Sequence, residues 1–460
     1  MPRRAPARRT GPFGEAVPPP AQRRADGKAL RTTTPRSSHD GWQPAADRFD
    51  PVDVLIESGR TRQKSLLPIR NARMAASPFA FLRGSALVMA HDLASTPVSG
   101  LTTQLCGDAH ISNFGVFASP ERRLVFDLND FDETCEGWFE WDVKRFAASI
   151  AVAGRERGLS DAECRSTVHG AVETYCEWVD RYAQMTRLDL WYARLDVDQV
   201  IAHFNPVLRR DVGQVARKAS EKNHLKALAK LTTVVDGRRQ IVPDPPLVER
   251  FGGPKLEQRL EALLDQYART LPADRRSLLQ HFRFVDFARK VVGVGSVGTR
   301  CWMVLLQGPN GGPLFLQIKE ANRAAPDIAR ANPSPSVHQG QRVVEGQQKL
   351  QAVGDVLLGW ATDEETGVHY YVRQLWDSKK SVDIPTLRAS SFRVYVGTCA
   401  WALARAHART GDPAAMSGYL GTSGAFPTAI AGFAMDYADQ TVRDHARLVQ
   451  AIAAGRLPAA

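Results

Sequence analysis

Two kinds of hydrophobic pattern follow one another along the chain. Apolar residues recur every three or four positions, the spacing of an amphipathic helix, over residues 141–183, 256–271, 338–352 and 394–409. Short apolar runs bounded by turn residues, which are typical of strands, occur over residues 302–306, 314–319 and 370–375. Helical and strand-like stretches are therefore grouped along the chain, and we expect an α+β fold.

A hairpin and a basic helix are predicted between these stretches. Val234-Val235 and Gln240-Ile241-Val242 are joined through Asp236-Gly237, a pair that favours the tight turn of a two-residue hairpin loop. Residues 207–231, just before it, are rich in Arg and Lys and have a helical pattern. We interpret this basic helix as a solvated face, with a role in binding an anionic substrate as the alternative.

Composition and charge set the first 45 residues apart from the rest. The chain has 460 residues, enough for two or three domains, and a net charge of +11. Its first 40 residues hold nine Arg or Lys against three acidic residues, and they are rich in Pro, Ala and Thr. We therefore predict a disordered basic tail over residues 1–45. We expect no nucleic-acid binding beyond weak contacts of this tail.

The sequence gives no sign of a membrane or secreted protein. No apolar run is long enough to span a bilayer, and the Arg-rich start is not followed by an apolar stretch of a secretory signal. The six cysteines are scattered, without a Cys-x-x-Cys pair, which favours a reducing compartment over a disulfide framework or a zinc site. We expect a cytoplasmic protein.

Candidate chemistry is concentrated first in two short segments, Gly107–Asn113 and Phe126–Asp132. The first sets a carboxylate and an amide five positions apart, and the second adds a cluster of carboxylates. Phosphoryl transfer uses such a set: a carboxylate orients the attacking hydroxyl, while an amide and a carboxylate hold magnesium. We therefore predict that Asp108 is the catalytic base or hydroxyl-orienting group, and that Asn113 and Asp127 bind Mg²⁺.

The polar neighbours of these residues have less specific predicted roles. Asp130 is a candidate second metal ligand or an organiser of the loop. His110 is a candidate catalytic residue, although a histidine in such a loop more often organises it through hydrogen bonds. Asp132 is expected to be structural or solvated. Asp142 is expected to cap the following helix and to hold the loop by its backbone.

A second block lies much later in the chain. Gly293, Gly295 and Gly298 form a Gly-x-Gly-x-x-Gly pattern. A dinucleotide site needs a helix directly after such glycines, whereas here a strand, an Asn-Gly turn and a second strand follow. A glycine loop followed by strands that end in a lysine is the arrangement of a kinase. We therefore predict that these glycines approach phosphates, with a tight strand connection as the alternative.

Lys319 ends the last of these strands. We predict that its amine reaches the phosphates of a nucleotide as a point charge. Glu345, on the predicted helix over 338–352, is the candidate partner of Lys319, although Glu320 is adjacent and could compete. The predicted cofactors are ATP and Mg²⁺.

These motifs resemble the kinase-like superfamily, especially its aminoglycoside and choline phosphotransferase branch. Cys106-Gly107-Asp108 stands where that branch has His-Gly-Asp, and Asp127 and Asp130 match its Asp-x-x-Asp. From about residue 50 to residue 445 the chain is also similar to a bacterial family known as domain of unknown function 2252. That second resemblance implies no established activity.

The two blocks stand in the reverse of the order found in that superfamily. The resemblance therefore implies a two-lobed protein-kinase-like fold that is circularly permuted, which is feasible because a cut in an exposed loop leaves the core contacts intact. The implied parts are a basic tail over 1–45, a helical catalytic lobe over 46–290, a strand-rich nucleotide-binding lobe over 291–380, and C-terminal helices over 381–460 that complete the helical lobe.

The predicted function is that of an ATP- and magnesium-dependent phosphotransferase acting on an unknown small-molecule or protein acceptor. Two alternatives stay open: a non-catalytic nucleotide-binding module, and a nucleotidyltransferase that transfers adenylate. A metal hydrolase built on the same carboxylates ranks lower, because His110 is the only histidine of the block.

Overall fold

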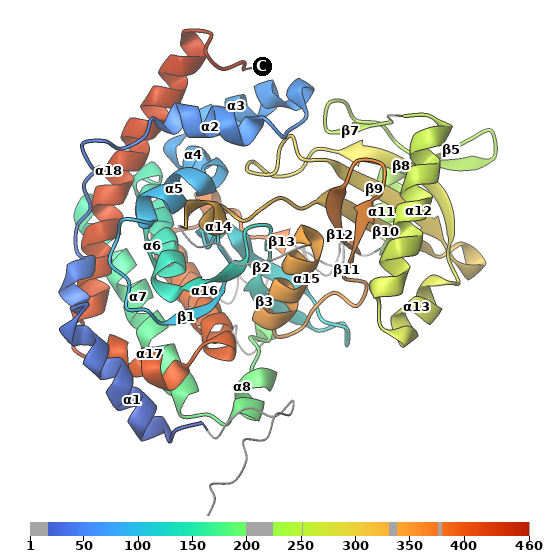
Figure 1. The fold of residues 1–460 in the computed structure, drawn as a ribbon. Coiled ribbons are helices and arrows are strands. Elements are labelled where there is room, and N and C mark those ends of the chain that lie inside the picture. Colours follow the sequence, from blue (N-terminus) through green and yellow to red (C-terminus); the bar gives the residue numbers. More distant parts are fainter. Residues whose placement is uncertain (1–16, 199–223, 251, 331–337, 376–379, 460) are drawn as a thin grey trace, which may run out of the picture.

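The computed structural model describes residues 17–198, 224–250, 252–330, 338–375 and 380–459. Its chain forms a helical part and a part built on a six-stranded antiparallel sheet, which lie side by side (Figure 1). The expected mixture of helices and strands in an α+β protein is confirmed. Among the described residues no helix is both long and apolar enough to cross a membrane.

The helical part is centred on α6, which is buried over Phe139 to Gly154. Its predicted apolar positions, such as Phe146 and Ile150, are fully enclosed. The helix α7 begins at a capping box in which Ser160 and Glu163 satisfy each other's backbone N–H groups. The long helices of this part are α6 Phe139–Glu156, α7 Asp161–Ala183, α16 Ala389–Thr410, α17 Pro413–Leu420 and α18 Ala425–Ala453.

Short helices cover this centre and reach toward the sheet. Figure 1 shows α2 to α5 above α6, with α14 beside them. They are α2 Pro51–Gly59, α3 Leu67–Ala75, α4 Pro78–Gly84, α5 Ala86–Leu93, α8 Arg187–Tyr192 and α14 Ala325–Ala329.

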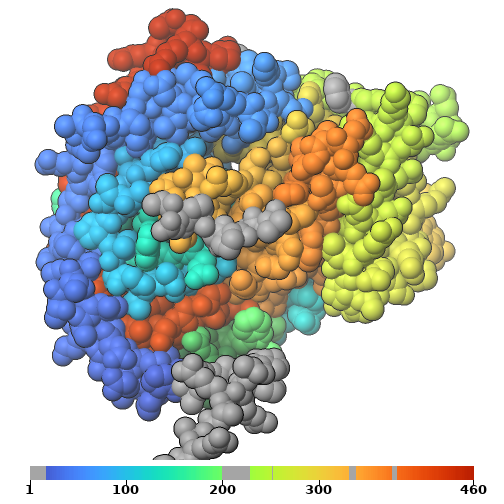
Figure 2. Space-filling view, in the orientation of Figure 1, coloured from blue at the N-terminus to red at the C-terminus, as the bar shows by residue number. Residues whose placement is uncertain are grey.

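The predicted disordered tail is wrong for the residues that the structure describes. The helix α1 Pro20–Ala29 packs against α17, and the blue N-terminal segment lies along the edge of the helical part in Figure 2. A Cβ atom at Gly27 would lie 1.9 Å from the Ala415 carbonyl oxygen, so glycine permits this close approach of two backbones. Arg23 forms an ion pair with Asp412, and Arg24 pairs with Asp180. Residues 1–16 lie outside the described residues.

The six-stranded sheet has the order β11-β12-β10-β9-β8-β7. All of its pairings are antiparallel. Its strands are β7 Val248–Glu249, β8 Arg283–Lys290, β9 Cys301–Gln307, β10 Pro313–Glu320, β11 Gly359–Asp363 and β12 Val368–Gln374. Because β7 and β8 precede residue 291, the strand-rich part begins earlier in the chain than the predicted boundary.

Helices cover both faces of this sheet. Along β9, Val304 packs with Leu260 and Leu263 of α12, whereas the next residue, Leu305, packs in a separate cluster with Ile241. This alternation is the period-two pattern of a strand buried on both faces. The covering elements are α11 His224–Leu231, α12 Pro254–Thr270, α13 Ala273–Leu279, α15 Gln339–Leu350, and the hairpin of β5 Thr232–Val235 and β6 Arg238–Ile241.

Two small sheets in the helical part carry the first sequence block. One pairs β1 Thr102–Leu105 with β4 Cys135–Trp138. The other has the order β13-β2-β3, with β2 Phe114–Ala118, β3 Leu124–Leu128 and β13 Lys380–Ser381. The segment Gly107–Asn113 therefore lies between β1 and β2, and Asn129–Thr134 lies between β3 and β4. Both segments leave the same small sheets, which brings them together.

Candidate active site

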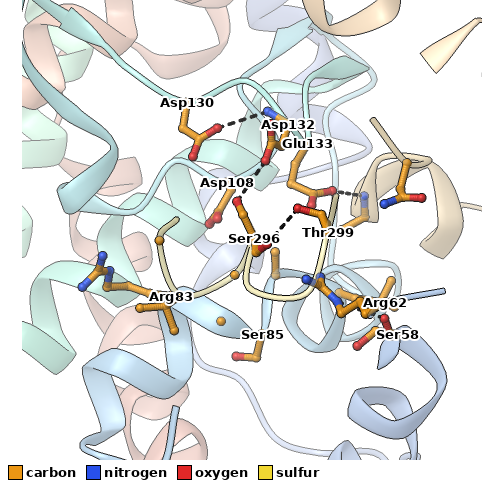
Figure 3. A pocket seen from close by; sticks show the side chains of 18 of the residues that line it. Ser58, Arg62, Arg83, Ser85, Asp108, Asp130, Asp132, Glu133, Ser296 and Thr299 are labelled. Carbon is orange, nitrogen blue, oxygen red and sulfur yellow. Dashed lines mark hydrogen bonds between the residues drawn. The ribbon is translucent and has the colours of Figure 1, made fainter. Parts of the chain in front are cut away.

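A pocket of about 210 Å³ lies where the two parts of the molecule meet. Five regions of the chain line it: residues 54–87 from α2 to α5, residues 108–113, residues 130–133, the glycine segment, and residues 320–328. Figure 3 shows the carboxylates of Asp108, Asp130, Asp132 and Glu133 on one side of this pocket. The glycine segment runs through the middle of that view, where Ser296 and Thr299 are labelled.

The Gly107–Asn113 segment is held by its backbone. The Asp142 carboxylate accepts hydrogen bonds from the backbone N–H groups of Cys106, at 2.7 Å, and Gly107, at 3.0 Å. His407 Nε2 of α16 lies 3.2 Å from the same carboxylate. The Asn113 side-chain amide donates to the Asp108 carbonyl oxygen at 2.7 Å. Asp142 in the first turn of α6 thus fixes the loop, and the prediction that it holds the loop by its backbone is confirmed. Its predicted role as the helix cap is wrong, because Trp138 is the N-cap of α6 and no side chain of the described residues caps this helix.

Asp108 lines the pocket, and its orientation is set by a buried arginine. Arg145 Nε donates to Asp108 Oδ1 at 2.7 Å, and Arg145 Nη2 donates to the Leu82 carbonyl at 2.7 Å. The other oxygen, Asp108 Oδ2, lies 3.6 Å from His110 Nε2. Burial lowers the pKa of His110 to about 4, although the charge of Asp108 opposes this shift. The imidazole is therefore neutral at neutral pH, which suits a loop-organising role.

The glycine segment joins two neighbouring antiparallel strands, β8 and β9. Gly293 and Gly298 have positive φ angles of 67° and 93°, a conformation that other residues rarely adopt. Gly293 and Gly295 line the pocket. Gly298 does not: its carbonyl accepts from the Gln63 N–H at 2.8 Å. Two of the predicted glycines, Gly293 and Gly295, therefore line the pocket, whereas Gly298 anchors the loop.

Lys319 connects the two sequence blocks. Its buried ammonium forms an ion pair with Asp132 and donates to Ser296 Oγ at 2.8 Å. Ser296 Oγ also lies 3.1 Å from Asp132 Oδ2, and Tyr371 OH donates to Asp132 Oδ1 at 2.8 Å. Burial alone would raise the pKa of the Asp132 carboxyl, but the Lys319 charge holds it at about 2. Residues 187 positions apart thus share one ionic network.

Asp127 lies elsewhere, which contradicts its predicted role as a metal ligand. Arg405 Nη2 of α16 donates to both of its carboxylate oxygens, at 2.8 and 2.7 Å. The N–H groups of Leu128 and Ala352 bond to the same carboxylate. Asp127 is 2 % exposed and does not line the pocket, because its side chain leaves β3 toward the helical core. Asp130, beyond the end of β3, lines the pocket and replaces it as the candidate metal ligand.

Glu345 does not pair with Lys319, so that prediction is also wrong. Its side chain is exposed and accepts from Gln341 Nε2 at 2.7 Å, within α15. The face of α15 that turns toward the site carries Arg342 instead, whose Nη2 donates to the backbone carbonyls of Asp132, at 2.8 Å, and Asn322, at 2.7 Å. Glu320 is the partner of Arg300, at 3.1 Å. The helix supports the site, but through an arginine.

Hard oxygen donors are available around the pocket. Asn113, Asp130 and Glu133 all line it, and Glu133 accepts a hydrogen bond from the Ala325 N–H at 2.5 Å. Burial raises the pKa of Glu133 to about 7. No three His, Cys, Asp or Glu side chains converge on a metal position within the described part of the chain. Carboxylate and amide oxygens, the donor types present here, are the ligand types that Mg²⁺ takes in proteins.

A family comparison covers most of the chain. The model of a family described as an uncharacterized protein conserved in bacteria, DUF2252, matches residues 62–451. The chain belongs to this family. No curated protein and no solved structure matches the chain. The DUF2252 match includes both blocks that form the pocket.

Sequence reasoning missed several pocket residues of this DUF2252 protein. Asp132 was expected to be structural or solvated, yet it is the partner of Lys319. One signal was present: the apolar Phe131 separates two acidic neighbours, Asp130 and Asp132, and both of these line the pocket. Ser296, Arg145 and Glu133 gave no such signal, because their roles depend on contacts between distant segments.

Proposed function

We propose that the protein is an ATP- and magnesium-dependent phosphotransferase of the kinase-like type. The observation that supports this most directly is the network of Lys319, Asp132 and Ser296, in which a strand lysine joins a glycine loop to a carboxylate segment, and both of these line one pocket. A positively charged side chain, a glycine-rich backbone and oxygen donors around one cavity are the groups that phosphoryl transfer requires.

Each residue would have a defined task in this reaction. Lys319 and the backbone of the glycine segment would bind the phosphates, while Asn113 and Asp130 would hold magnesium, which neutralises phosphate charge when bound. Asp108 would accept the proton of the acceptor hydroxyl. The oxygen–phosphorus bond to the acceptor forms as the bond between the γ-phosphorus and the ADP oxygen breaks. Arg145 would keep Asp108 oriented throughout.

The reversed order of the blocks agrees with a circular permutation. The C-terminal helix α16 supplies Arg405 to β3 and His407 to the Asp142 carboxylate, so the end of the chain supports the first block. A kinase-like helical lobe assembled from both ends of the chain is what such a permutation would produce. This topology is part of the proposal.

Radiolabelled ATP tests the reaction type. Incubation of the protein and a panel of hydroxyl acceptors with γ-labelled and with α-labelled ATP distinguishes phosphate transfer from adenylate transfer. We expect transfer of the γ label, magnesium dependence, and loss of transfer in Asp108→Asn with nucleotide affinity retained. The control is Asp439→Asn, since Asp439 is an exposed carboxylate far from the pocket. Transfer of the α label would instead identify a nucleotidyltransferase.

A nucleotide-binding module without turnover is the second candidate. It is favoured by the closed arrangement of the site, in which Lys319 and Asp132 pair directly and Ser296 Oγ contacts both of them. Magnesium-dependent nucleotide binding with neither label transferred, and with Asp108→Asn indistinguishable from the parent protein, would support this candidate and exclude the phosphotransferase.

A further inference from the structure

Arginines form a second, cationic side of the pocket. Arg62, Arg70 and Arg83 come from residues 51–84, a part of the chain to which the kinase-like motifs assign nothing. In Figure 3, Arg62 and Arg83 lie on the opposite side of the glycine segment from Asp130, Asp132 and Glu133. The pocket therefore has an acidic side and a basic side.

These guanidinium groups lack carboxylate partners among the described residues. Arg70 donates to Ser58 Oγ at 3.4 Å and to the Gly84 carbonyl at 3.2 Å. Arg62 donates to the carbonyls of Ser58 and Val297, at 3.1 and 2.7 Å. Arg83 makes no hydrogen bond to another described residue, and its guanidinium lies 6.0 Å from the centroid of Phe79. Neutral groups thus solvate these charges only in part.

The burial of Arg70 makes this arrangement costly without a counter-charge. Arg70 is 2 % exposed, and its Nε atom has no hydrogen-bond partner among the described residues. Burial lowers the pKa of Arg70, and the neighbouring charge of Arg62 lowers it further. By contrast, the buried Arg48 pairs with Asp92 and Asp444. A buried cation that lines a cavity without a carboxylate is suited to an anion from solution.

Arg83 links the basic side to the candidate catalytic residue. Burial lowers the pKa of Arg83, and the charge of Asp108 opposes this shift. Both line the same pocket. An anionic group bound at Arg83 would therefore lie near the position where Asp108 would receive a hydroxyl.

We propose that the acceptor carries an oxyanion, a phosphate or a carboxylate, which Arg62, Arg70 and Arg83 bind while its hydroxyl faces Asp108; this inference rests on the proposed function. Guanidinium groups bind phosphate and carboxylate alike through paired hydrogen bonds, so one site of this kind can bind either group. Lys319 has its own carboxylate partner, Asp132, and would bind the nucleotide instead. The acceptor is thus an anionic hydroxyl compound.

Calorimetric titration of the full chain tests this site without nucleotide, with inorganic phosphate and malonate as probes. The variants are Arg83→Gln, Arg70→Lys, Lys319→Met, and Arg60→Gln as the matched control, because Arg60 is 72 % exposed and pairs with Glu57. We expect Arg83→Gln and Arg70→Lys to weaken anion binding about tenfold or more, the effect of losing a charged hydrogen bond. Lys319→Met and Arg60→Gln should retain anion binding. The anion that binds more tightly identifies the acceptor group.

Separate titrations with ADP keep this test independent of the proposed function. Arg83→Gln should bind ADP like the parent protein, and it should fold normally, since Arg83 makes no hydrogen bond to a described residue. The proposal is overturned if the parent chain binds neither anion, if both arginine variants bind as tightly as the parent, or if Lys319→Met weakens anion binding most. Failure of label transfer with anion binding intact would overturn the proposed function alone.

Discussion

Two buried ion pairs, Asp127–Arg405 and Asp132–Lys319, join distant parts of this chain and differ in what surrounds them. Arg405 and Asp127 are enclosed by the helical core, and backbone groups of Leu128 and Ala352 complete the hydrogen bonds of the carboxylate. Asp132 and Ser296 line a pocket, and the buried Lys319 contacts both of them without lining it. The first pair is enclosed by protein atoms, whereas the carboxylate of the second pair, Asp132, faces a pocket that a ligand could enter.

The position of each aspartate relative to the end of β3 explains this difference. Asp127 lies within β3 and is paired across the small sheet with Gly115, so its side chain has a fixed direction toward α16. Asp130 and Asp132 follow the strand end and turn toward the pocket. Carboxylates within five positions of one another therefore lie in the core in one case and at the pocket in the other.

Substitution of the core pair should have the largest effect. Asp127→Asn leaves the fully buried Arg405 without a counter-charge, and we expect the free energy of unfolding to fall by about 3–5 kcal/mol. Chemical denaturation measures this loss. Asp130→Asn, on the half-buried side of the same segment, is the matched control and should change stability by about 0.5 kcal/mol or less. Equal losses in the two variants would contradict the division between core and pocket.

Substitution in the pocket should affect ligand binding instead. Lys319→Met removes the charge assigned to the phosphates, and Asp130→Asn removes a candidate metal ligand. We expect each to weaken binding of ADP with magnesium about tenfold or more. Titration with and without magnesium separates them, because Asp130→Asn should lose only the magnesium-dependent part. Unchanged affinity in Asp130→Asn would remove Asp130 from the metal site.

The same comparison indicates how much the sequence could predict. The pattern of apolar residues located the major helices and strands, and the two chemical blocks were recognised before their meeting point was visible. The choice among Asp127, Asp130 and Asp132 could not be made, because it depends on where β3 ends and on Arg405, which is 278 positions away. Local spacing does not encode such contacts.

The N-terminal segment was misjudged for a related reason. Its basic, Pro-rich composition is typical of disorder. The contacts that order it come from the other end of the chain. Asp412 forms an ion pair with Arg23, and the backbone of α17 packs closely against Gly27. Composition describes the segment alone and not its partner.

Substitutions on α15 should give a smaller effect and sharpen the account of Lys319. Glu345→Gln alters an exposed side chain, and we expect no measurable change in ADP affinity or in the melting temperature. Arg342→Met, on the inner face of the same helix, removes hydrogen bonds to the carbonyls of Asp132 and Asn322. This variant should lower both the ADP affinity and the melting temperature. Loss of ADP binding in Glu345→Gln would restore it as the partner of Lys319 in the nucleotide-bound state.

Titration of Glu133 should make the stability of the protein depend on pH. Its pKa in the folded protein is about 7, against 4.5 for an ordinary glutamate, so the folded state keeps a proton that the unfolded chain loses. The stabilising contribution is complete below pH about 4.5 and is lost as the pH rises through about 7. Relative to Glu133→Gln, which does not titrate, the parent protein should therefore lose stability across this range and then stay level.

His110 acts in the opposite direction over part of the same range. Burial lowers its pKa to about 4, so its contribution is present above pH about 6.5 and is lost as the pH falls. Because both proteins contain His110, its effect cancels when the unfolding free energies of the parent and Glu133→Gln are compared at each pH.

A metal ion bound near Glu133 would favour the carboxylate, so ADP with magnesium should release a proton from the parent protein alone at pH about 6.5. Identical pH profiles and identical proton release in the two proteins would show that Glu133 titrates as an ordinary surface carboxylate and has no part in the metal site.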